Sequence, residues 1–211
     1  MRILFYPWFG SRIKNITKYI NNYKYLFGQD TVVDVVPYKI HQSVLFSNWK
    51  KIRKGELLKT YDKDYDVVHM ISGGCIVGYN QMEFFYNKTP KKVIFDSGPF
   101  FPCSHLTANF LQKNINFIPE LAIKPIGNMF DYTWKLQGAK NLNEEYDEWL
   151  NSRYNSLCLL NRNDELLDLE RIDKYLKLSK SKLVEINEEH AFLLKDKELY
   201  NQSIFDYLSD D

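Results

Sequence analysis

Short apolar runs recur along the chain, and helix-length segments separate them. Most runs are continuous rather than alternating and are rich in β-branched and aromatic residues, a pattern typical of strands buried on both faces. They cover residues 3–6, 31–36, 67–71, 92–95, 157–160 and 182–186. The intervening and terminal segments predict helices over residues 13–26, 49–61, 75–86, 167–178 and 200–208. Because strands that alternate with helices form right-handed crossovers, we expect an α/β fold with a parallel sheet of about six strands flanked by helices.

Residues 100–155 interrupt this alternation. The segment contains Pro102, Pro119, Pro125, Gly127 and Gly138 but no clear strand. A structureless loop of that length is unusual inside a compact domain. We therefore predict a helical insertion, a lid or cap above the sheet, within a single domain that spans residues 1–211.

Composition and charge exclude several classes of protein. The 211 residues are 45% hydrophobic and 26% charged, as in ordinary globular proteins. The formal net charge of +1 gives no electrostatic reason to expect a nucleic-acid or anionic-membrane partner. No apolar run approaches the roughly 18 residues of a membrane-spanning helix, and the N-terminus lacks a signal-peptide cleavage site. The chain is thus expected to be cytoplasmic, with its oligomeric state left open.

Cysteine usage points to a reducing compartment. Cys75, Cys103 and Cys158 are odd in number and have no metal-ligand spacing. We expect three reduced thiols, no metal and no cofactor.

A serine and two glycines follow the third predicted strand. Ser72, Gly73 and Gly74 stand between residues 67–71 and the next predicted helix. This is the arrangement of a nucleophile elbow, in which residues near the serine must be small because helix and strand almost touch. Gly74 meets that need, whereas Met70 occupies a position where the usual elbow has glycine. The alternative is a glycine-rich turn that opens a helix, with an anion site at the helix N-terminus.

Two further side chains extend the pattern. Asp164 follows the fifth predicted strand, and His190 follows the sixth and is the only histidine in the C-terminal half. The chain order Ser72, Asp164, His190, with each residue after its own strand, is the order of the triad in α/β-hydrolases. In this hypothesis His190 takes the proton of Ser72, and Asp164 orients and stabilises the imidazolium.

The same hypothesis assigns an oxyanion hole and a pocket. The N–H group of Gly73, directly after the serine, is one expected donor, and the other comes from Trp8 or Phe9 in the loop after the first strand. Asp96 and Ser97, at the end of the fourth strand, are expected to line the substrate pocket. Asp96 is also the competing choice for the triad acid.

Several of these segments carry a family resemblance. They are residues 8–11, 14–15, 18–19, 69–74, 94–99, 160–165 and 189–190, together with the aromatic-rich last helix. In them the chain resembles the α/β-hydrolases grouped with transmembrane protein 53 and the fungal indole-diterpene biosynthesis proteins. The resemblance implies the same fold, with Ser72, Asp164 and His190 as the triad. The chain differs at Gly73, where the family usually has a small polar residue, and residues 100–155 match no part of it.

The sequence therefore predicts a serine hydrolase that cleaves a carboxylic ester or thioester through an acyl-enzyme. The expected partner is a small-molecule ester or acyl substrate. A narrower variant places the acyl group on an acidic carrier protein, which the basic cluster at residues 50–54 would attract. The alternative is a non-catalytic binding or regulatory protein on the same scaffold, since fold does not fix function. A nucleotide-binding loop is disfavoured because G-x-G-x-x-G and a Walker lysine are both missing.

Overall fold

The computed structural model describes residues 1–8, 11–36, 63–85, 90–99, 122, 125, 128–129, 132, 142–153, 155–179, 181–187 and 197–210. Its centre is a six-stranded parallel sheet in the order β2-β1-β3-β4-β5-β6. The strands are β1 (Arg2–Tyr6), β2 (Val32–Val35), β3 (Val67–Ile71), β4 (Lys92–Asp96), β5 (Ser156–Leu160) and β6 (Lys182–Glu185). All six expected strands are present, so the predicted α/β fold is confirmed.

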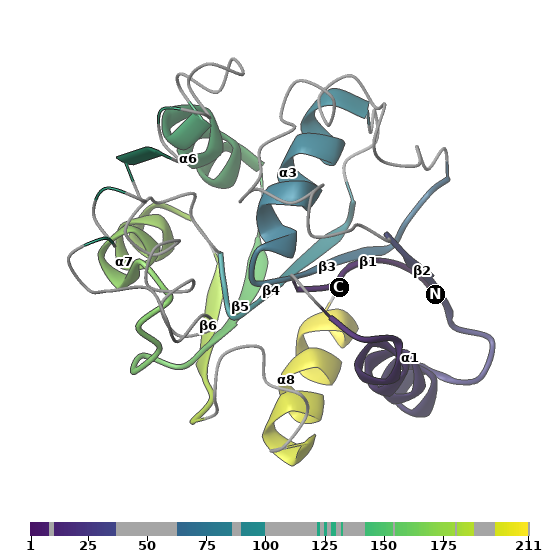
Figure 1. The fold of residues 1–211 in the computed structure, drawn as a ribbon. Coiled ribbons are helices and arrows are strands. Elements are labelled where there is room, and N and C mark those ends of the chain that lie inside the picture. Colours follow the sequence, from purple (N-terminus) through teal and green to yellow (C-terminus); the bar gives the residue numbers. More distant parts are fainter. Residues whose placement is uncertain are drawn as a thin grey trace.

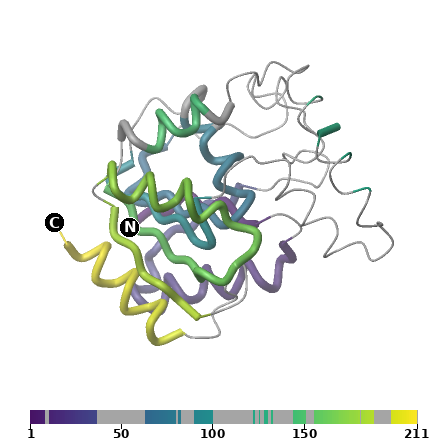
Figure 2. Tube along the Cα trace, turned by 90° about the vertical axis from the view of Figure 1, so that its left-hand side faces the viewer, coloured from purple at the N-terminus to yellow at the C-terminus, as the bar shows by residue number. Residues whose placement is uncertain are grey.

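Helices cover both faces of the sheet (Figure 1). The helices α1 (Ile13–Phe27) and α8 (Lys197–Ser209) lie on one face, and α3 (Gly74–Phe85), α6 (Leu142–Arg153) and α7 (Leu169–Leu178) lie on the other. The side view in Figure 2 shows the same separation of α1 and α8 from α6. Among the helices that the structure describes, none has the length and apolar character needed to cross a bilayer.

Burial on both faces explains the continuous apolar runs. Every residue of β3 and of β5 is buried. Along β3, Val68 and Met70 join the hydrophobic cluster under α3, α6 and α7, while Val67 and Ile71 join the cluster under α1 and α8. A strand with helices on both sides has no solvent face to mark with polar residues.

Helix starts differ from the sequence prediction by a few residues. The helix α7 begins at Leu169 rather than at residue 167, because Asp168 caps it: its carboxylate accepts the Arg171 N–H at 3.2 Å. The helix α8 begins at Lys197 rather than at residue 200, with an exposed first turn. The helix predicted over residues 49–61 lies outside the described residues.

One helix lies within the segment predicted as a lid. In α6, Tyr146 and Trp149 are buried, with ring centroids 5.1 and 5.2 Å from that of Tyr79 on α3. An ion pair between Asp147 and Arg171, with an N–O distance of 2.6 Å, joins α6 to α7. This part of residues 100–155 therefore belongs to the helix layer over the sheet. The rest of the segment lies outside the described residues except for six positions, and the lid stays a prediction.

Buried acidic groups predict a loss of stability at high pH. Burial raises the pKa of the Cys158 thiol from 9.0 to about 12 and that of the Tyr175 hydroxyl from 10.0 to about 12. The folded protein then keeps protons that the unfolded chain has lost, so stability is complete below about pH 9 and falls as the pH rises toward 12. From Cys158 alone, the free energy of unfolding should drop by about 2 kcal/mol between pH 9 and 11. Urea denaturation at both pH values measures this drop, and an undiminished drop in Cys158→Ala would contradict the assignment.

Candidate active site

Ser72 sits on a strained turn between β3 and α3. Its φ is +50°, a left-handed conformation that costs a residue with a Cβ atom about 1–2 kcal/mol. Its N–H donates to the carbonyl of Asp96 at 2.9 Å, and its own carbonyl accepts the N–H of Cys75 at 2.9 Å. A serine held this way between a strand and a helix has the backbone geometry of a nucleophile elbow. Strain of this kind persists where the surrounding structure imposes it, and it concentrates at functional sites.

Gly74 allows the start of α3 to lie against the end of β1. A Cβ atom at this position would lie 2.5 Å from the carbonyl oxygen of Tyr6 and 2.7 Å from that of Pro7. Both neighbours are backbone atoms, so a side chain cannot be accommodated by rotating another side chain. The close approach also brings the loop after β1, which continues into Trp8, beside the serine turn.

Met70 stands on β3 where the usual elbow has glycine, and a glycine on α3 makes room for its side chain. Met70 is fully buried, and a Cβ atom on Gly78 would lie 2.6 Å from its sulfur. The missing side chain at Gly78 thus provides the space that Met70 fills. The glycine that leaves room between strand and helix is therefore Gly78 on α3, instead of a glycine at position 70 of β3.

The candidate oxyanion donors come from two loops, one after β3 and one after β1, and the structure describes Gly73 and Trp8 of them. Gly73 directly follows Ser72, and its carbonyl accepts the N–H of Ile76 in the first turn of α3. Trp8 follows β1, and its ring centroid lies 6.0 Å from that of Tyr19 on α1. Phe9 lies outside the described residues.

Asp164 lies in a partly exposed turn after β5. Its carboxylate accepts the N–H of Leu166 at 3.0 Å, and its own N–H donates to the carbonyl of Asn161 at 3.1 Å. Because β3, β4 and β5 are parallel neighbours, Ser72, Asp96 and the Asp164 turn follow the same, carboxyl edge of the sheet. His190, the third expected triad residue, lies outside the described residues.

Asp96 and Ser97 end β4 in a fully buried environment. The Asp96 carboxylate accepts the hydroxyl groups of Tyr200 at 2.8 Å and Tyr19 at 3.4 Å, and the Ser97 hydroxyl lies 3.4 Å from its other oxygen. Ser97 has a φ of +49° and donates its N–H to Leu159 at 2.8 Å. Ser97 therefore leaves β4 in the same left-handed conformation in which Ser72 leaves β3.

A buried histidine joins this group. His69 has no exposed surface; its Nδ1 atom lies 2.8 Å from the Tyr23 hydroxyl, and its Nε2 atom lies 3.7 Å from Asp96 Oδ2. Burial, and after it the charge of Asp96, raises the pKa values of Tyr19, Tyr23 and Tyr200 well above the ordinary value, so the three phenols keep their protons. We name these five residues the Asp96 cluster. Sequence reasoning missed the cluster, although Tyr19 and Tyr23 stand four residues apart on one helix face.

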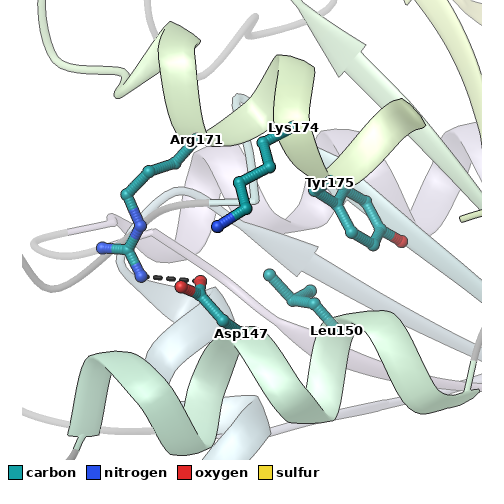
Figure 3. A pocket seen from close by; sticks show the side chains of 5 residues that line it. All are labelled: Asp147, Leu150, Arg171, Lys174 and Tyr175. Atoms are coloured by element: carbon teal, nitrogen blue, oxygen red, sulfur yellow. Dashed lines mark hydrogen bonds and ion pairs between the residues drawn. The ribbon is translucent and has the colours of Figure 1, made fainter. Parts of the chain in front are cut away.

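A separate small pocket lies between α6 and α7. Its volume is about 50 Å³, and it is lined by Asp147, Leu150, Arg171, Lys174 and Tyr175 (Figure 3). The Arg171 guanidinium is held by the Asp147 carboxylate. None of the predicted site residues lines this pocket.

Comparison with known proteins identifies the fold. No protein-family model and no curated protein matches the chain. Among solved structures, an esterase from Exiguobacterium antarcticum is similar over 99% of this chain and 91% of its own, with a TM-score of 0.60 and 11% identity. ClbQ from the colibactin NRPS/PKS pathway is similar over 98% and 97%, with a TM-score of 0.52 and 12% identity. YbtT, a type II thioesterase from the yersiniabactin NRPS/PKS pathway, is similar over 98% and 92%, with a TM-score of 0.51 and 11% identity. At these identities the comparison shows the fold, and the fold of this chain is that of the α/β-hydrolases.

Proposed function

We propose that this protein is a serine hydrolase that cleaves a carboxylic ester or thioester, with Ser72 as the nucleophile. The observation that carries the proposal is the left-handed backbone of Ser72 between β3 and α3, at the carboxyl edge of the sheet. The similarity of the fold to esterases and a type II thioesterase supports the same reaction class. The motifs in residues 69–74 and 94–99 support a distant relationship to the transmembrane protein 53 group.

The reaction has two half-reactions. His190 takes the proton of the Ser72 hydroxyl as its oxygen attacks the acyl carbon, and the N–H of Gly73 with that of Trp8 or Phe9 stabilises the oxyanion. The N-terminal end of α3 adds a favourable dipole. Collapse of the tetrahedral intermediate breaks the ester or thioester bond, and His190 gives its proton to the departing alcohol or thiol. In the second half, His190 takes a proton from water, the resulting hydroxide attacks the acyl-enzyme, and the acid leaves as Ser72 regains its proton.

We assign Asp164 as the acid that orients His190. The Asp96 carboxylate already accepts Tyr19 and Tyr200 and faces the layer of α1 and α8. Asp164 lies in the turn after the next strand, partly exposed. An acid in an accessible turn can meet a histidine from a neighbouring segment, whereas the Asp96 carboxylate is committed to two phenols.

Replacement of each aspartate by asparagine distinguishes the role of Asp164 from that of Asp96. Asp164→Asn should lower kcat by about 10⁴-fold through loss of the correct histidine tautomer, with little change in stability because the amide oxygen can still accept the Leu166 N–H. Asp96→Asn should mainly destabilise the fold, since it changes a buried polar network. Steady-state kinetics and thermal denaturation of both variants test the assignment. An Asp164→Asn enzyme with wild-type kcat would contradict it.

The direct test of the proposed reaction is a substrate panel. Wild-type protein and Ser72→Ala are assayed on p-nitrophenyl esters and on N-acetylcysteamine thioesters of increasing acyl length. Turnover that depends on Ser72 supports the hydrolase. No turnover of any ester or thioester by folded wild-type protein would favour the non-catalytic scaffold.

The acyl group of a carrier protein is the substrate class that we favour among thioesters. ClbQ and YbtT, which share the fold, come from NRPS/PKS pathways, and the basic residues Lys50, Lys51, Arg53 and Lys54 would attract an acidic carrier. Reversing these four charges should raise KM for a carrier-bound thioester by about tenfold at low salt and leave KM for a small thioester unchanged. Reversal of Lys174 and Lys177, both exposed on α7, is the control. Equal KM values for all three proteins would remove this substrate class.

A further inference from the structure

We propose that the Asp96 cluster positions Ser72 for reaction by tying α1 and α8 to the strand end on which the serine turn rests. This inference rests on the proposed function. Asp96, Tyr200, Tyr19, Tyr23 and His69 are then positioning residues, which act through the backbone of Ser72 and do not touch substrate. For Asp96, this role replaces the one expected from the sequence, in which it lines the substrate pocket.

Besides Asp96 itself, the cluster takes its side chains from three elements that adjoin segments with proposed catalytic groups. The helix α1, which supplies Tyr19 and Tyr23, follows the loop of the expected oxyanion donor Trp8. The strand β3, which supplies His69, ends at Ile71, one residue before the nucleophile. The helix α8, which supplies Tyr200, follows the segment that contains His190. The elements that adjoin Trp8, Ser72 and His190 in the sequence therefore all contribute side chains to one buried polar cluster.

Asp96 connects this group to the serine directly. Its carbonyl accepts the Ser72 N–H at 2.9 Å, while its carboxylate accepts Tyr200 at 2.8 Å and Tyr19 at 3.4 Å. One residue thus holds the nucleophile by its backbone and two helices by its side chain. A displacement of either helix moves the acceptor of the Ser72 N–H.

The hydrogen bonds of the cluster centre on the Asp96 carboxylate. The phenols of Tyr200 and Tyr19 donate to it, and the Tyr23 hydroxyl shares a hydrogen bond with Nδ1 of His69. Nε2 of His69 has no hydrogen-bond partner among the described residues and lies 3.7 Å from Asp96 Oδ2. A polar network without water access is sensitive to the loss of any one donor, because the group left behind is buried and only partly satisfied.

Backbone strain explains why the serine needs such support. Ser72 and Ser97 both have a φ near +50°, and the N–H bonds of Ser72 to Asp96 and of Ser97 to Leu159 hold the two turns on either side of the β4 end. Left-handed residues with a side chain relax unless their surroundings fix them. At the end of β4, the buried side chains of the cluster join both α1 and α8 to the strand.

A matched pair of phenylalanine variants on α8 tests the inference. Tyr200→Phe removes the hydroxyl that binds Asp96. Tyr207→Phe removes an equally buried hydroxyl from the same helix, one that accepts the Val93 N–H at 3.1 Å and donates to the Asn155 carbonyl at 2.6 Å, near the amino ends of β4 and β5. Both changes remove one buried hydroxyl, so a purely structural role predicts similar effects of the two.

The first measurement is hydrogen exchange of the Ser72 and Cys75 amides, which needs no activity. The two variants are compared under conditions in which their free energies of unfolding are equal. We expect the two amides to exchange about tenfold faster in Tyr200→Phe than in Tyr207→Phe. Equal exchange in the two variants, or no change in Tyr200→Phe, would overturn the inference.

The second measurement is the rate of covalent labelling by a fluorophosphonate probe. Tyr200→Phe should lower the maximal labelling rate by about tenfold without changing the probe concentration at half-maximal rate, and Tyr207→Phe should label like wild type. Wild-type rates in both variants would overturn positioning and leave the proposed function intact. If wild type is not labelled but Tyr200→Phe alone speeds exchange of the serine-turn amides, the proposed function fails, while the link between the cluster and the Ser72 backbone stands.

Discussion

Ser72→Ala is expected to lower kcat for the best ester or thioester by between about 10⁴- and 10⁶-fold, because it removes the oxygen that forms the acyl-enzyme. The backbone N–H of Ser72 donates to Asp96 and its carbonyl accepts the Cys75 N–H, and alanine keeps both hydrogen bonds. The free energy of unfolding should therefore change by less than about 1 kcal/mol. Steady-state kinetics with the preferred substrate and a thermal melt measure the two quantities.

Ser97→Ala is the matched control for this experiment. Ser97 is a buried serine with nearly the same φ at the end of the adjacent strand, and its hydroxyl donates to the Asp96 carboxylate at 3.4 Å. Its replacement should reduce kcat by less than about tenfold. Loss of activity in Ser97→Ala with retention in Ser72→Ala would move the nucleophile from β3 to β4.

Gly74→Ala is expected to destabilise the protein by about 3 kcal/mol and to lower Tm by about 10 °C. The new methyl group would lie 2.5 Å from the Tyr6 carbonyl oxygen and 2.7 Å from the Pro7 carbonyl oxygen. Relief requires that the start of α3 move away from β1, so activity should fall along with stability. Thermal and urea denaturation give the stability change.

Gly78→Ala serves as the control in the same helix. Its methyl group would meet the sulfur of Met70 at 2.6 Å, on a flexible side chain that can change rotamer. Alanine also favours a helix over glycine by about 1 kcal/mol, so the net destabilisation should be smaller than that of Gly74→Ala. A Gly74→Ala protein as stable as Gly78→Ala would show that α3 does not need the close approach to β1.

Local sequence was sufficient to predict the sheet. Each strand is a short apolar run, and burial between two helix layers makes such runs continuous. Helix starts depend on finer features. The cap of α7 is Asp168, and the first turn of α8 carries Lys197 and Glu198 on an exposed surface, where apolar spacing gives no signal.

The serine turn could also be read from sequence, since strand, serine, glycines and helix are contiguous. What the sequence did not reveal was why Met70 is tolerated there, because the compensating residue, Gly78, lies a further turn along the helix.

The Asp96 cluster required the three-dimensional structure. Tyr200 and Asp96 are 104 residues apart, and Tyr23 and His69 are 46 apart. In the sequence, His69 and Asp96 already stand out as polar residues within apolar strands. Their proximity depends on the register that places His69 opposite Ile94 and Ile71 opposite Asp96, and on the packing of α1 and α8 over that face.

The most direct test of the central claim, that Ser72 is an activated nucleophile, is peptide mapping of the wild-type protein after reaction with a fluorophosphonate. We expect one adduct per chain on the peptide that contains Ser72, and none after heat denaturation before labelling. A folded wild-type protein that carries no adduct, or an adduct on another residue with Ser72 unmodified, would contradict the claim.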